Sequence, residues 1–510
     1  MTTYIGDLDS SGTLVTITNG ATLPSYFRTD GTAQVFGYVG TTLITVEGVA
    51  LSAIGTDGNG RQTWRLATGH NPNTTNVQFT VAQPFVGAQN AIYQNCASIS
   101  ATPGTLPLSG TLSASAGYGG SDGGSSIDLG AAFTGAQKCV AWFWGDVFWA
   151  TAAGQTRGQS TTIRGPMALQ TGGTYWLNYT TSGTASVGSD NLTFYTGGTN
   201  TAPKQFVQAT WPSTTTWPFY GGGCLGQYSL IFAGPQVQNV LSSGETVNSD
   251  AFYWVNNINT AGSVTPPTQW VIQTIPGPGG EAMGGISTPP WVTLATPVNA
   301  ANPSGPTRTD VYWLGHGYDS QTNVTYHNGN SQPLFYRGYV AGRTPVSDLN
   351  VAAASITPSF ARTEYWCGPS GWVQNPDANM VVPVIPWGLN KPEGVYANHY
   401  GLDTTFGLYQ KSDGTFVVAI VIDFADGRLG YTNMASISNP STVTSFNEFY
   451  YIPTSFSNNG SDLYNLFVHP EQTWPGKATD DICVHYNIFD NSGFTSAATY
   501  WPQFVQVTGI

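Results

Sequence analysis

The stretch 404–423, TTFGLYQKSDGTFVVAIVID, holds two runs of strand-forming residues on either side of a tight turn. Between them, Lys411, Ser412, Asp413 and Gly414 indicate a turn, because Asp-Gly supplies the positive φ angles that a tight turn needs. The second run is apolar at every position from Phe416 to Ile422, so both faces of that strand must be covered. The stretch therefore predicts an antiparallel hairpin whose second strand lies in the middle of a β-sandwich or barrel.

Period-two alternation of apolar and polar residues recurs along the chain and predicts a protein made of strands. Near the C-terminus, DICVHYNIF from Asp481 places one face in the core, formed by Ile482, Val484, Tyr486 and Ile488. Other runs of this kind are TLVTIT from Thr13, TTLITV from Thr41, VQFTVA from Val77, TYWLNYT from Thr174 and QYSLIF from Gln227. Because no helical period extends beyond about three turns, we expect an all-β fold with few, short helices.

The length of 510 residues indicates two or three folding units, or one unit with very long loops. Two segments poor in strand patterning divide the chain, and either could be a long loop between strands. The predicted organisation has three β regions: an N-terminal segment (1–108), a central region (131–275) and a C-terminal region with the late core strands (307–510). A Gly/Ser-rich loop (109–130) and a Pro/Gly-rich loop (276–306) separate them.

Charged residues make up only 8% of the chain, against about 25% in a typical soluble domain. Neutral polar groups cost less to desolvate than ions, so this composition suits a surface that is covered by copies of the same protein. The net charge is −13 and the basic residues are scattered singly. We therefore expect many copies of the chain as partners, and contacts with a packaged genome that are weak because no basic arm exists.

The cysteines and the N-terminus carry no sign of export, and no segment predicts a membrane helix. The five cysteines are odd in number and form no CxxC pair, so neither a disulfide framework nor a zinc site is expected. They are Cys96, Cys139, Cys224, Cys367 and Cys483. The N-terminus lacks the basic and apolar regions of a secretory signal. The uncharged segment 205–244 is interrupted by three prolines and a glycine run, which excludes a spanning helix.

Catalytic patterns are largely missing, and no catalytic residue is predicted. No two of the seven glutamates are close enough in sequence to share one strand face, although distant carboxylates could still meet in space. They are Glu47, Glu245, Glu281, Glu364, Glu393, Glu448 and Glu471. A G-x-S-x-G match centred on Ser121 lies in a glycine and serine run without the strand and helix that a nucleophile elbow requires.

Metal and cofactor patterns are also missing, so no cofactor and no metal ligand is predicted. Asp7, Asp9, Ser11 and Gly12 imitate half of a calcium loop, but Thr18 stands where the closing glutamate would be. A turn capped by aspartates is the preferred interpretation. The six histidines show no metal-binding spacing, and no phosphate-binding loop is present. They are His70, His316, His327, His399, His469 and His485, the last expected to be a partly buried strand residue.

An aromatic cluster between Trp142 and Trp149 could stack on sugars or bases, but aromatic residues of a β-rich chain more often fill cores or subunit interfaces. Its members are Trp142, Phe143, Trp144, Phe148 and Trp149. We therefore expect these rings to lie in a core or an interface.

The chain resembles the jelly-roll capsid proteins of small non-enveloped icosahedral viruses. The resemblance rests on low charge, long loops, and two segments similar to late jelly-roll strands, DDICVHYNIFDN from Asp480 and TWPFYGGGCLGQYSLIFAG from Thr216. The lack of a basic arm favours parvovirus-like or bidnavirus-like insect viruses. The resemblance implies an antiparallel β-sandwich (jelly roll) with long inserted surface loops, located in the virion.

The sequence thus predicts a capsid protein that self-assembles into an icosahedral shell enclosing the genome, and not an enzyme. One alternative is a viral or phage fibre or receptor-binding protein, which would form an elongated trimer. The second alternative is a carbohydrate-active β-sandwich enzyme or lectin, which would bind or cleave glycans. The sequence does not identify a host receptor.

Overall fold

The computed structural model consists almost entirely of antiparallel strands, which confirms the all-β prediction. Helical turns among the described residues are limited to η3 (Pro267–Gln269), α2 (Val346–Leu349) and η4 (Gly368–Ser370). The structure describes residues 3–40, 42–85, 117–121, 124–129, 138–152, 159–164, 167–172, 178–179, 185–186, 191–195, 216–218, 221–225, 229–240, 244–260, 263–265, 267–276, 293–295, 310–318, 324–325, 331–332, 336–349, 357–376, 380–386, 406–423, 427–452, 461–474, 476–490 and 502–510.

The first six strands form a closed barrel in the order β1-β2-β5-β4-β3-β6, which β6 completes by pairing with β1. Trp64 is fully buried inside it, with its ring 5.2 Å from that of Tyr4 and 5.7 Å from that of Phe79. Because the barrel is closed, each of its strands has a hydrogen-bonded neighbour on both sides. The strands are β1 (Tyr4–Leu8), β2 (Leu14–Ile17), β3 (Gln34–Val39), β4 (Thr42–Thr56), β5 (Gln62–Leu66) and β6 (Val77–Pro84).

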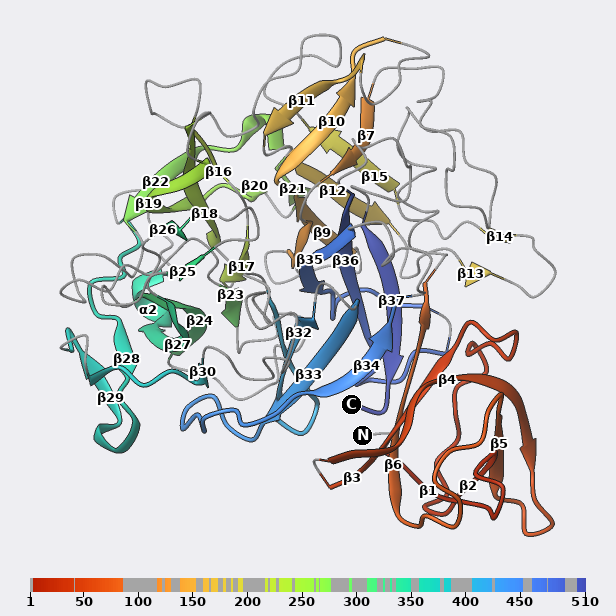
Figure 1. Ribbon diagram of the computed structural model, residues 1–510. Coiled ribbons are helices and arrows are strands. Elements are labelled where there is room, and N and C mark those ends of the chain that lie inside the picture. Colours follow the sequence, from red (N-terminus) through yellow and green to blue (C-terminus); the bar gives the residue numbers. More distant parts are fainter. Residues whose placement is uncertain are drawn as a thin grey trace.

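Strand β6 also joins the barrel to the C-terminal strands. Its first half pairs with β1 and its second half pairs with β37 (Gln503–Thr508), which is followed in the same sheet by β36 (Ile482–Asp490) and β35 (Ser461–Val468). The two ends of the chain therefore lie side by side (Figure 1), and the hydroxyl oxygens of Tyr4 and Thr508 are 3.2 Å apart.

The segment after the barrel forms two small sheets and a short ribbon. One sheet has the order β11-β10-β7 and the other the order β15-β12-β9-β8, while β13 and β14 pair with each other. The strands are β7 (Gly117–Ser121), β8 (Ser125–Asp128), β9 (Lys138–Phe143), β10 (Asp146–Ala150), β11 (Thr161–Arg164), β12 (Met167–Gly172), β13 (Asn178–Tyr179), β14 (Ala185–Ser186) and β15 (Asn191–Tyr195).

The next sheet has the order β16-β18-β19-β22, with β17 also paired to β18, and a separate two-stranded ribbon is formed by β20 and β21. Its long central strands run antiparallel over most of their length with one bulge. The strands are β16 (Thr216–Pro218), β17 (Gly221–Leu225), β18 (Ser229–Val240), β19 (Gly244–Val255), β20 (Asn259–Thr260), β21 (Ser263–Val264) and β22 (Ile272–Pro276).

Two more sheets precede the C-terminal strands, in the orders β23-β24-β27-β28-β29, with β30 also on β27, and β31-β32-β33-β34. A further ribbon pairs β25 with β26. The strands are β23 (Thr293–Ala295), β24 (Asp310–Tyr318), β25 (Val324–Thr325), β26 (Ser331–Gln332), β27 (Tyr336–Pro345), β28 (Glu364–Trp366), β29 (Trp372–Gln374), β30 (Ile385–Pro386), β31 (Phe406–Gln410), β32 (Phe416–Asp423), β33 (Arg428–Met434) and β34 (Asn447–Tyr451).

Five of the sheets after the barrel, those that contain β8, β17, β23, β31 and β35, contact one another in a ring. Strand β8 contacts β17, β17 contacts β23, β23 contacts β31, and β31 contacts β35. Hydrogen bonds between Ser126 on β8 and the residues His469 and Glu471, which follow β35, connect the last sheet to the first. Successive parts of the sequence thus form successive sheets around a common centre (Figure 1).

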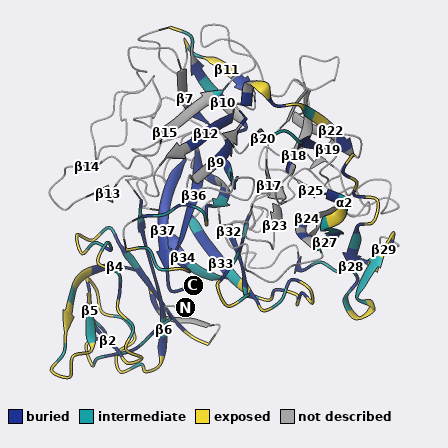
Figure 2. Ribbon diagram, turned by 180° about the vertical axis from the view of Figure 1, so that it is seen from behind, coloured by how far each residue is buried: buried dark blue, intermediate teal, exposed yellow. Residues whose placement is uncertain are grey.

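The hairpin predicted at 404–423 is confirmed as β31 and β32. Strand β32 lies between β31 and β33 and is buried on both faces, as its unbroken apolar run predicts. On one face Val417 and Ala419 join the core of the C-terminal strands, and on the other Phe416 and Val418 pack with residues of β24 and β27. Figure 2 shows this part of the molecule largely in the colour of buried residues.

The core face predicted for DICVHYNIF is also confirmed, because Ile482, Val484, Tyr486 and Ile488 all belong to one hydrophobic cluster. The opposite face is buried as well, and it includes His485, which is 0% exposed and not partly buried as predicted. This opposite face of β36 is covered by the β8–β9–β12 sheet. Local periodicity cannot predict such a contact between segments that are distant in the sequence.

Other predicted strands are confirmed as β2, β4, β6 and β18, whereas only the β13 residues of TYWLNYT lie within the described residues. The predicted segment boundaries stay predictions. Strands β7 and β8 lie within the range 109–130, and most of 276–306 lies outside the described residues.

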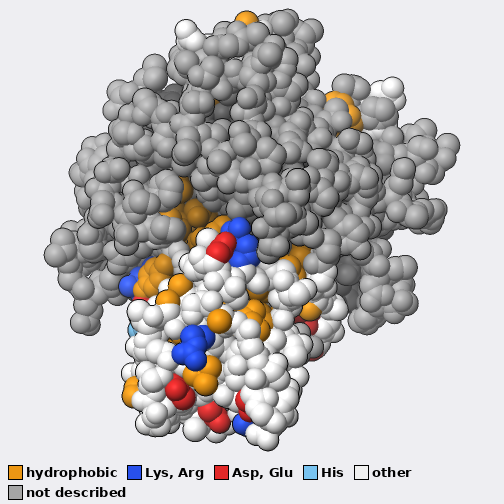
Figure 3. Space-filling view, turned by 90° about the vertical axis from the view of Figure 1, so that its right-hand side faces the viewer, with side chains coloured by type: hydrophobic (Ala, Val, Ile, Leu, Met, Phe, Trp, Pro, Cys, Tyr) orange, Lys and Arg blue, Asp and Glu red, His pale blue; other side chains and the backbone are white. Residues whose placement is uncertain are grey.

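The described surface of the barrel carries few charged side chains (Figure 3), as the composition leads one to expect. The largest exposed apolar side chains among the described residues are single ones: Val39, Val271 and Met380. In the part of the chain that the structure describes, no helix has the length and apolar character needed to cross a membrane.

Candidate functional site

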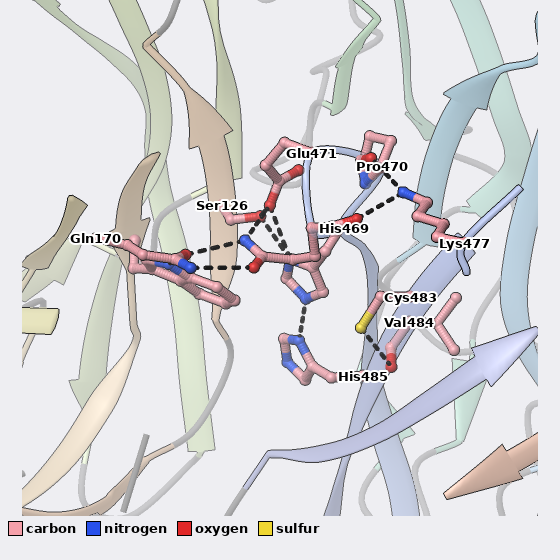
Figure 4. A network of polar contacts seen from close by, with 11 residues as sticks. Ser126, Gln170, His469, Pro470, Glu471, Lys477, Cys483, Val484 and His485 are labelled. Carbon is pink, nitrogen blue, oxygen red and sulfur yellow. Dashed lines mark hydrogen bonds and ion pairs between the residues drawn. The ribbon is translucent and has the colours of Figure 1, made fainter. Parts of the chain in front are cut away.

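The residue types most often used in catalysis meet in a buried polar cluster around His469 (Figure 4). His469 and Glu471 follow β35, His485 is on β36, and Ser126 comes from β8. The Ser126 hydroxyl oxygen is 2.5 Å from His469 Nδ1 and donates to Glu471 Oε1 at 2.5 Å, while His469 Nε2 is 2.6 Å from His485 Nδ1. We call these four residues the His469 cluster.

The protons of this cluster can be assigned from its hydrogen bonds. Because Ser126 gives its one proton to Glu471, His469 Nδ1 must donate to the serine, and His469 Nε2 then accepts from His485 Nδ1. In a serine nucleophile the direction is the opposite, since the serine donates to the histidine and the carboxylate holds the other ring nitrogen. The His469 cluster therefore lacks the arrangement of a catalytic triad.

Burial argues against catalysis as well. His469 is 0% exposed and the Glu471 side chain only 5%, and the Trp142 ring centroid lies 4.7 Å from that of His469. Burial lowers the pKa of His469 from 6.5 to about 3, so the ring is neutral and a weak base at neutral pH. These residues hold two sheets together.

Two glutamines extend the same contact. Gln170 on β12 and Gln472 exchange two amide hydrogen bonds, of 3.2 and 3.0 Å, and Gln472 also donates to Glu471 at 2.9 Å. The Trp142 indole donates to Gln170 at 3.0 Å. A buried network stabilises a fold when its members are satisfied in this way, and it links chain segments about 300 residues apart.

A second polar group brings together two glutamates from opposite ends of the chain. Arg428 Nη1 lies 2.7 Å from Glu448 Oε1 and 3.1 Å from Glu47 Oε1, and the Tyr451 hydroxyl donates to Glu47. Burial raises the pKa of Glu448, an effect that Arg428 opposes. The carboxylates that cleave a glycosidic bond flank the substrate with about 5 Å or more between them. Here the guanidinium occupies that space, so these residues form an ion-pair link between the barrel and the β33–β34 strands.

The third group lies on one face of β27, β28 and β29 and is more accessible than the His469 cluster, with exposures close to those of the Arg428 group. The strand register places Ala341, Trp366 and Trp372 in one row, and Arg343, Glu364 and Gln374 in the adjacent row. The β28–β29 hairpin turns through η4, where Gly368 and Gly371 have φ of 59° and 70°, values that favour glycine. We call Trp366, Trp372, Arg343, Glu364 and Gln374 the aromatic face.

The two tryptophans of the aromatic face are half-buried, with one side of each packed on the core below. Their ring centroids are 5.5 Å apart at 58°, and the Trp372 indole donates to the Ser438 carbonyl at 2.7 Å. Arg343 Cζ lies 5.0 Å from the centre of the Trp372 ring. Trp372 is therefore fixed from several sides, whereas the Trp366 indole N–H has no hydrogen-bond partner among the described residues.

The polar row beside the tryptophans offers both donors and acceptors. Arg343 Nε and Nη2 both contact Glu364 Oε2 at 2.5 Å, and the Gln374 amide donates to the Ala361 carbonyl at 3.0 Å. The side chains of Arg343 and Glu364 are 26% and 34% exposed. A flat apolar ring next to fixed hydrogen-bonding groups matches the composition of small-molecule sites.

The candidate residues picked out in the sequence analysis lie outside the aromatic face. Four of the five rings of the aromatic cluster between Trp142 and Trp149 are at most 2% exposed, which confirms a core position for them, whereas Phe148 is half-buried. Asp9 caps a turn by accepting from the backbone N–H groups of Ser11, Thr13 and Leu14, as predicted.

The G-x-S-x-G serine, Ser121, is buried on β7, and its backbone carbonyl accepts from Asn487. No group of metal-ligating side chains is found in the part of the chain that the structure describes. Sequence reasoning missed the aromatic face; the alternating aromatic residues on both sides of the Gly-Pro turn in EYWCGPSGWVQ, residues 364–374, were the available signal.

No protein-family model and no curated protein matches the chain. Solved structures show a distant likeness. A protein from Bacteroides ovatus provisionally described as a hydrolase has a TM-score of 0.49 at 11% identity, over 84% of this chain and 90% of that one. An α-L-arabinofuranosidase from Fusarium graminearum has a TM-score of 0.29 at 8% identity, over 75% of this chain and 92% of that one.

The Trypanosoma rangeli sialidase has a TM-score of 0.30 at 8% identity, over 99% of this chain and 59% of that one. At these scores the likeness supports no inference about function, which must come from the residues.

Proposed function

We propose that this protein binds carbohydrate through the aromatic face, which agrees with the lectin alternative drawn from the sequence. The observation that supports this proposal is the half-buried Trp366 ring beside the row of Arg343, Glu364 and Gln374. Sugar rings have an apolar face of C–H groups and a rim of hydroxyls. An indole ring packs on the first and fixed polar side chains bind the second.

The position of the aromatic face favours a receptor-binding role for such binding. Figures 1 and 2 show the β28–β29 hairpin at the edge of the molecule, on the side away from the barrel. A large ligand such as a cell-surface glycan can reach this edge, which would suit the viral or phage receptor-binding alternative.

A glycan array probed with the purified chain tests the proposal. We expect binding to a defined set of glycans and a loss of at least tenfold in affinity for Trp366→Ala, because hot-spot aromatic residues commonly contribute this much. Phe148→Ala removes another half-buried ring, on β10, and serves as the matched control that keeps binding. The proposal is overturned if the wild type binds no glycan, or if both variants bind as the wild type does.

For the fold, we infer that the ring of sheets is a five-bladed β-propeller and not the jelly roll that the resemblance implied. Three features support this: strands that follow one another within each sheet, contacts that run from sheet to sheet around a centre, and the pairing of β6 with β37, which brings the chain ends together in one sheet. An experimental structure that showed two facing sheets with Greek-key crossovers would overturn this inference.

Self-assembly into an icosahedral shell stays a proposal that rests on composition and on the resemblance. Light scattering and negative-stain imaging of the purified protein test it. Closed particles would support it, and a monomer or small oligomer at all salt concentrations and pH values would contradict it.

A further inference from the structure

The charges of the aromatic face are already paired within the protein. Arg343 and Glu364 lie directly opposite each other on β27 and β28, and two guanidinium nitrogens contact Glu364 Oε2 at 2.5 Å. Arg362, which precedes β28, is likewise paired, with its Nε 2.7 Å from Asp348 Oδ2. The described arginines next to the tryptophans therefore offer no uncompensated positive charge.

Two atoms of the ion pair between Arg343 and Glu364 make no hydrogen bond with the described residues, and both can bind a hydroxyl group. Glu364 Oε1 accepts no hydrogen bond from the described residues, and Arg343 Nη1 donates none. A sugar hydroxyl can donate to the first and accept from the second, because it has both a proton and lone pairs. A carboxylate can only accept, and it would lie next to the carboxylate of Glu364 without a free cation to balance it.

We infer that the aromatic face selects neutral sugars over acidic ones, an inference that rests on the proposed carbohydrate binding. Glu364 is the specificity-determining residue: it neutralises Arg343, accepts from a ligand hydroxyl and repels a ligand carboxylate. The net charge of −13 adds a weaker, long-range repulsion of acidic glycans.

The test compares the affinities of matched neutral and acidic ligands, galacto-oligosaccharides against galacturono-oligosaccharides and lactose against 3′-sialyllactose, by isothermal titration. We expect the wild type to bind the neutral member of at least one pair at least tenfold more tightly. In Glu364→Gln the amide no longer neutralises Arg343, so the acidic member should gain about tenfold and its affinity should fall with added salt. Glu47→Gln, a carboxylate on the barrel, is the control and should keep the wild-type preference.

The inference is overturned if the wild type prefers the acidic ligands, or if Glu364→Gln leaves the preference unchanged while its far-UV circular dichroism and melting temperature show a folded protein. Either result would leave the proposed function standing, provided that the wild type binds a glycan and Trp366→Ala does not. Binding of neither member of any pair, together with a blank glycan array, would overturn both this inference and the proposed function.

Discussion

The His469 cluster has the residue types of a catalytic site but is buried, whereas the aromatic face has the residue types of a core but is partly exposed. The cluster holds a serine, two histidines and a glutamate, the usual residues of hydrolytic sites, yet His469 is 0% exposed and its pKa is lowered to about 3. The aromatic face holds tryptophans, the usual residues of a core, yet Trp366 is only half-buried and lies beside side chains that can bind a ligand.

The difference shows that accessibility and proton direction, and not residue type, decide which group can act on a ligand. In the cluster the hydrogen bonds of Ser126, His469 and Glu471 join one part of the protein to another, so their free energy contributes to stability. On the aromatic face, Glu364 Oε1 and Arg343 Nη1 make no hydrogen bond with any residue that the structure describes. Substitutions should therefore change stability at the first region and binding at the second.

The largest expected effect is that of Trp142→Ala at the border of the His469 cluster. Trp142 is 1% exposed, stacks on Trp144 at 5.8 Å between ring centroids and donates to Gln170. The loss should lower the free energy of unfolding by about 4 kcal/mol. Urea denaturation followed by circular dichroism measures it, and a change below about 1 kcal/mol would show that the cluster does not hold the sheets together.

Lowering the pH should reduce the stability of the protein, because His469 is buried in its neutral form. In the folded chain the pKa of His469 is about 3, against 6.5 for the free side chain, so only the unfolded state binds this proton between those values. Stability should be flat above pH 6.5 and fall as the pH is lowered through this window, with about 2 kcal/mol lost at pH 5.

His469→Gln provides the comparison for this pH dependence, because the amide does not titrate and the difference between the two proteins isolates the one group. The variant should be less stable at pH 8 and lose less on acidification. Denaturation curves at pH 8, 6.5 and 5 decide the question, and parallel slopes for the two proteins would refute the neutral, buried state.

Trp366→Ala should cost about 2 kcal/mol of stability, less than Trp142→Ala, although it removes as large a side chain. Trp366 is half-buried and packs on the core with one side only. The same urea experiment applies. A loss as large as that of Trp142→Ala would make Trp366 a core residue and weaken its assignment to a ligand site.

Glu47→Gln should have the smallest effect on stability, about 0.5 kcal/mol. The Glu47 side chain is 40% exposed and its ion pair with Arg428 is 3.1 Å long, conditions under which ion pairs contribute little. Melting temperatures at low and high salt should differ less for the variant than for the wild type. A loss of several kcal/mol would mean that the glutamate pair has a larger part in the fold than its exposure indicates.

Local features of the sequence were sufficient to predict the strands. The 404–423 hairpin could be predicted because the apolar run defines its burial and Gly414 allows its turn. Of the two residues expected to have a positive φ, only Gly414 has one, of 90°, and the turn closes between Lys411 and Thr415. Long-range pairings could not be predicted, since nothing in Val77–Pro84 specifies that its partner is Gln503–Thr508. For the same reason the ring of sheets was not foreseen.

The sites were harder to predict than the strands. The glutamates were compared along the chain, where Glu47 and Glu448 are far apart, but the fold places both on Arg428. Trp366 resembles any other strand tryptophan in sequence, because exposure depends on which segments cover it. The charge pairing of Arg343 and Glu364 follows from strand register, which period-two patterns do not determine.

The most direct test of the central claim is fluorine NMR of the protein labelled with 5-fluorotryptophan, with the Trp366 and Trp142 signals assigned from Trp366→Phe and Trp142→Phe. On titration with a neutral oligosaccharide that binds in the array, the Trp366 signal should shift in a saturable way and the Trp142 signal should stay in place. A Trp366 signal that is unchanged at saturating ligand would contradict the account, whatever the other signals do.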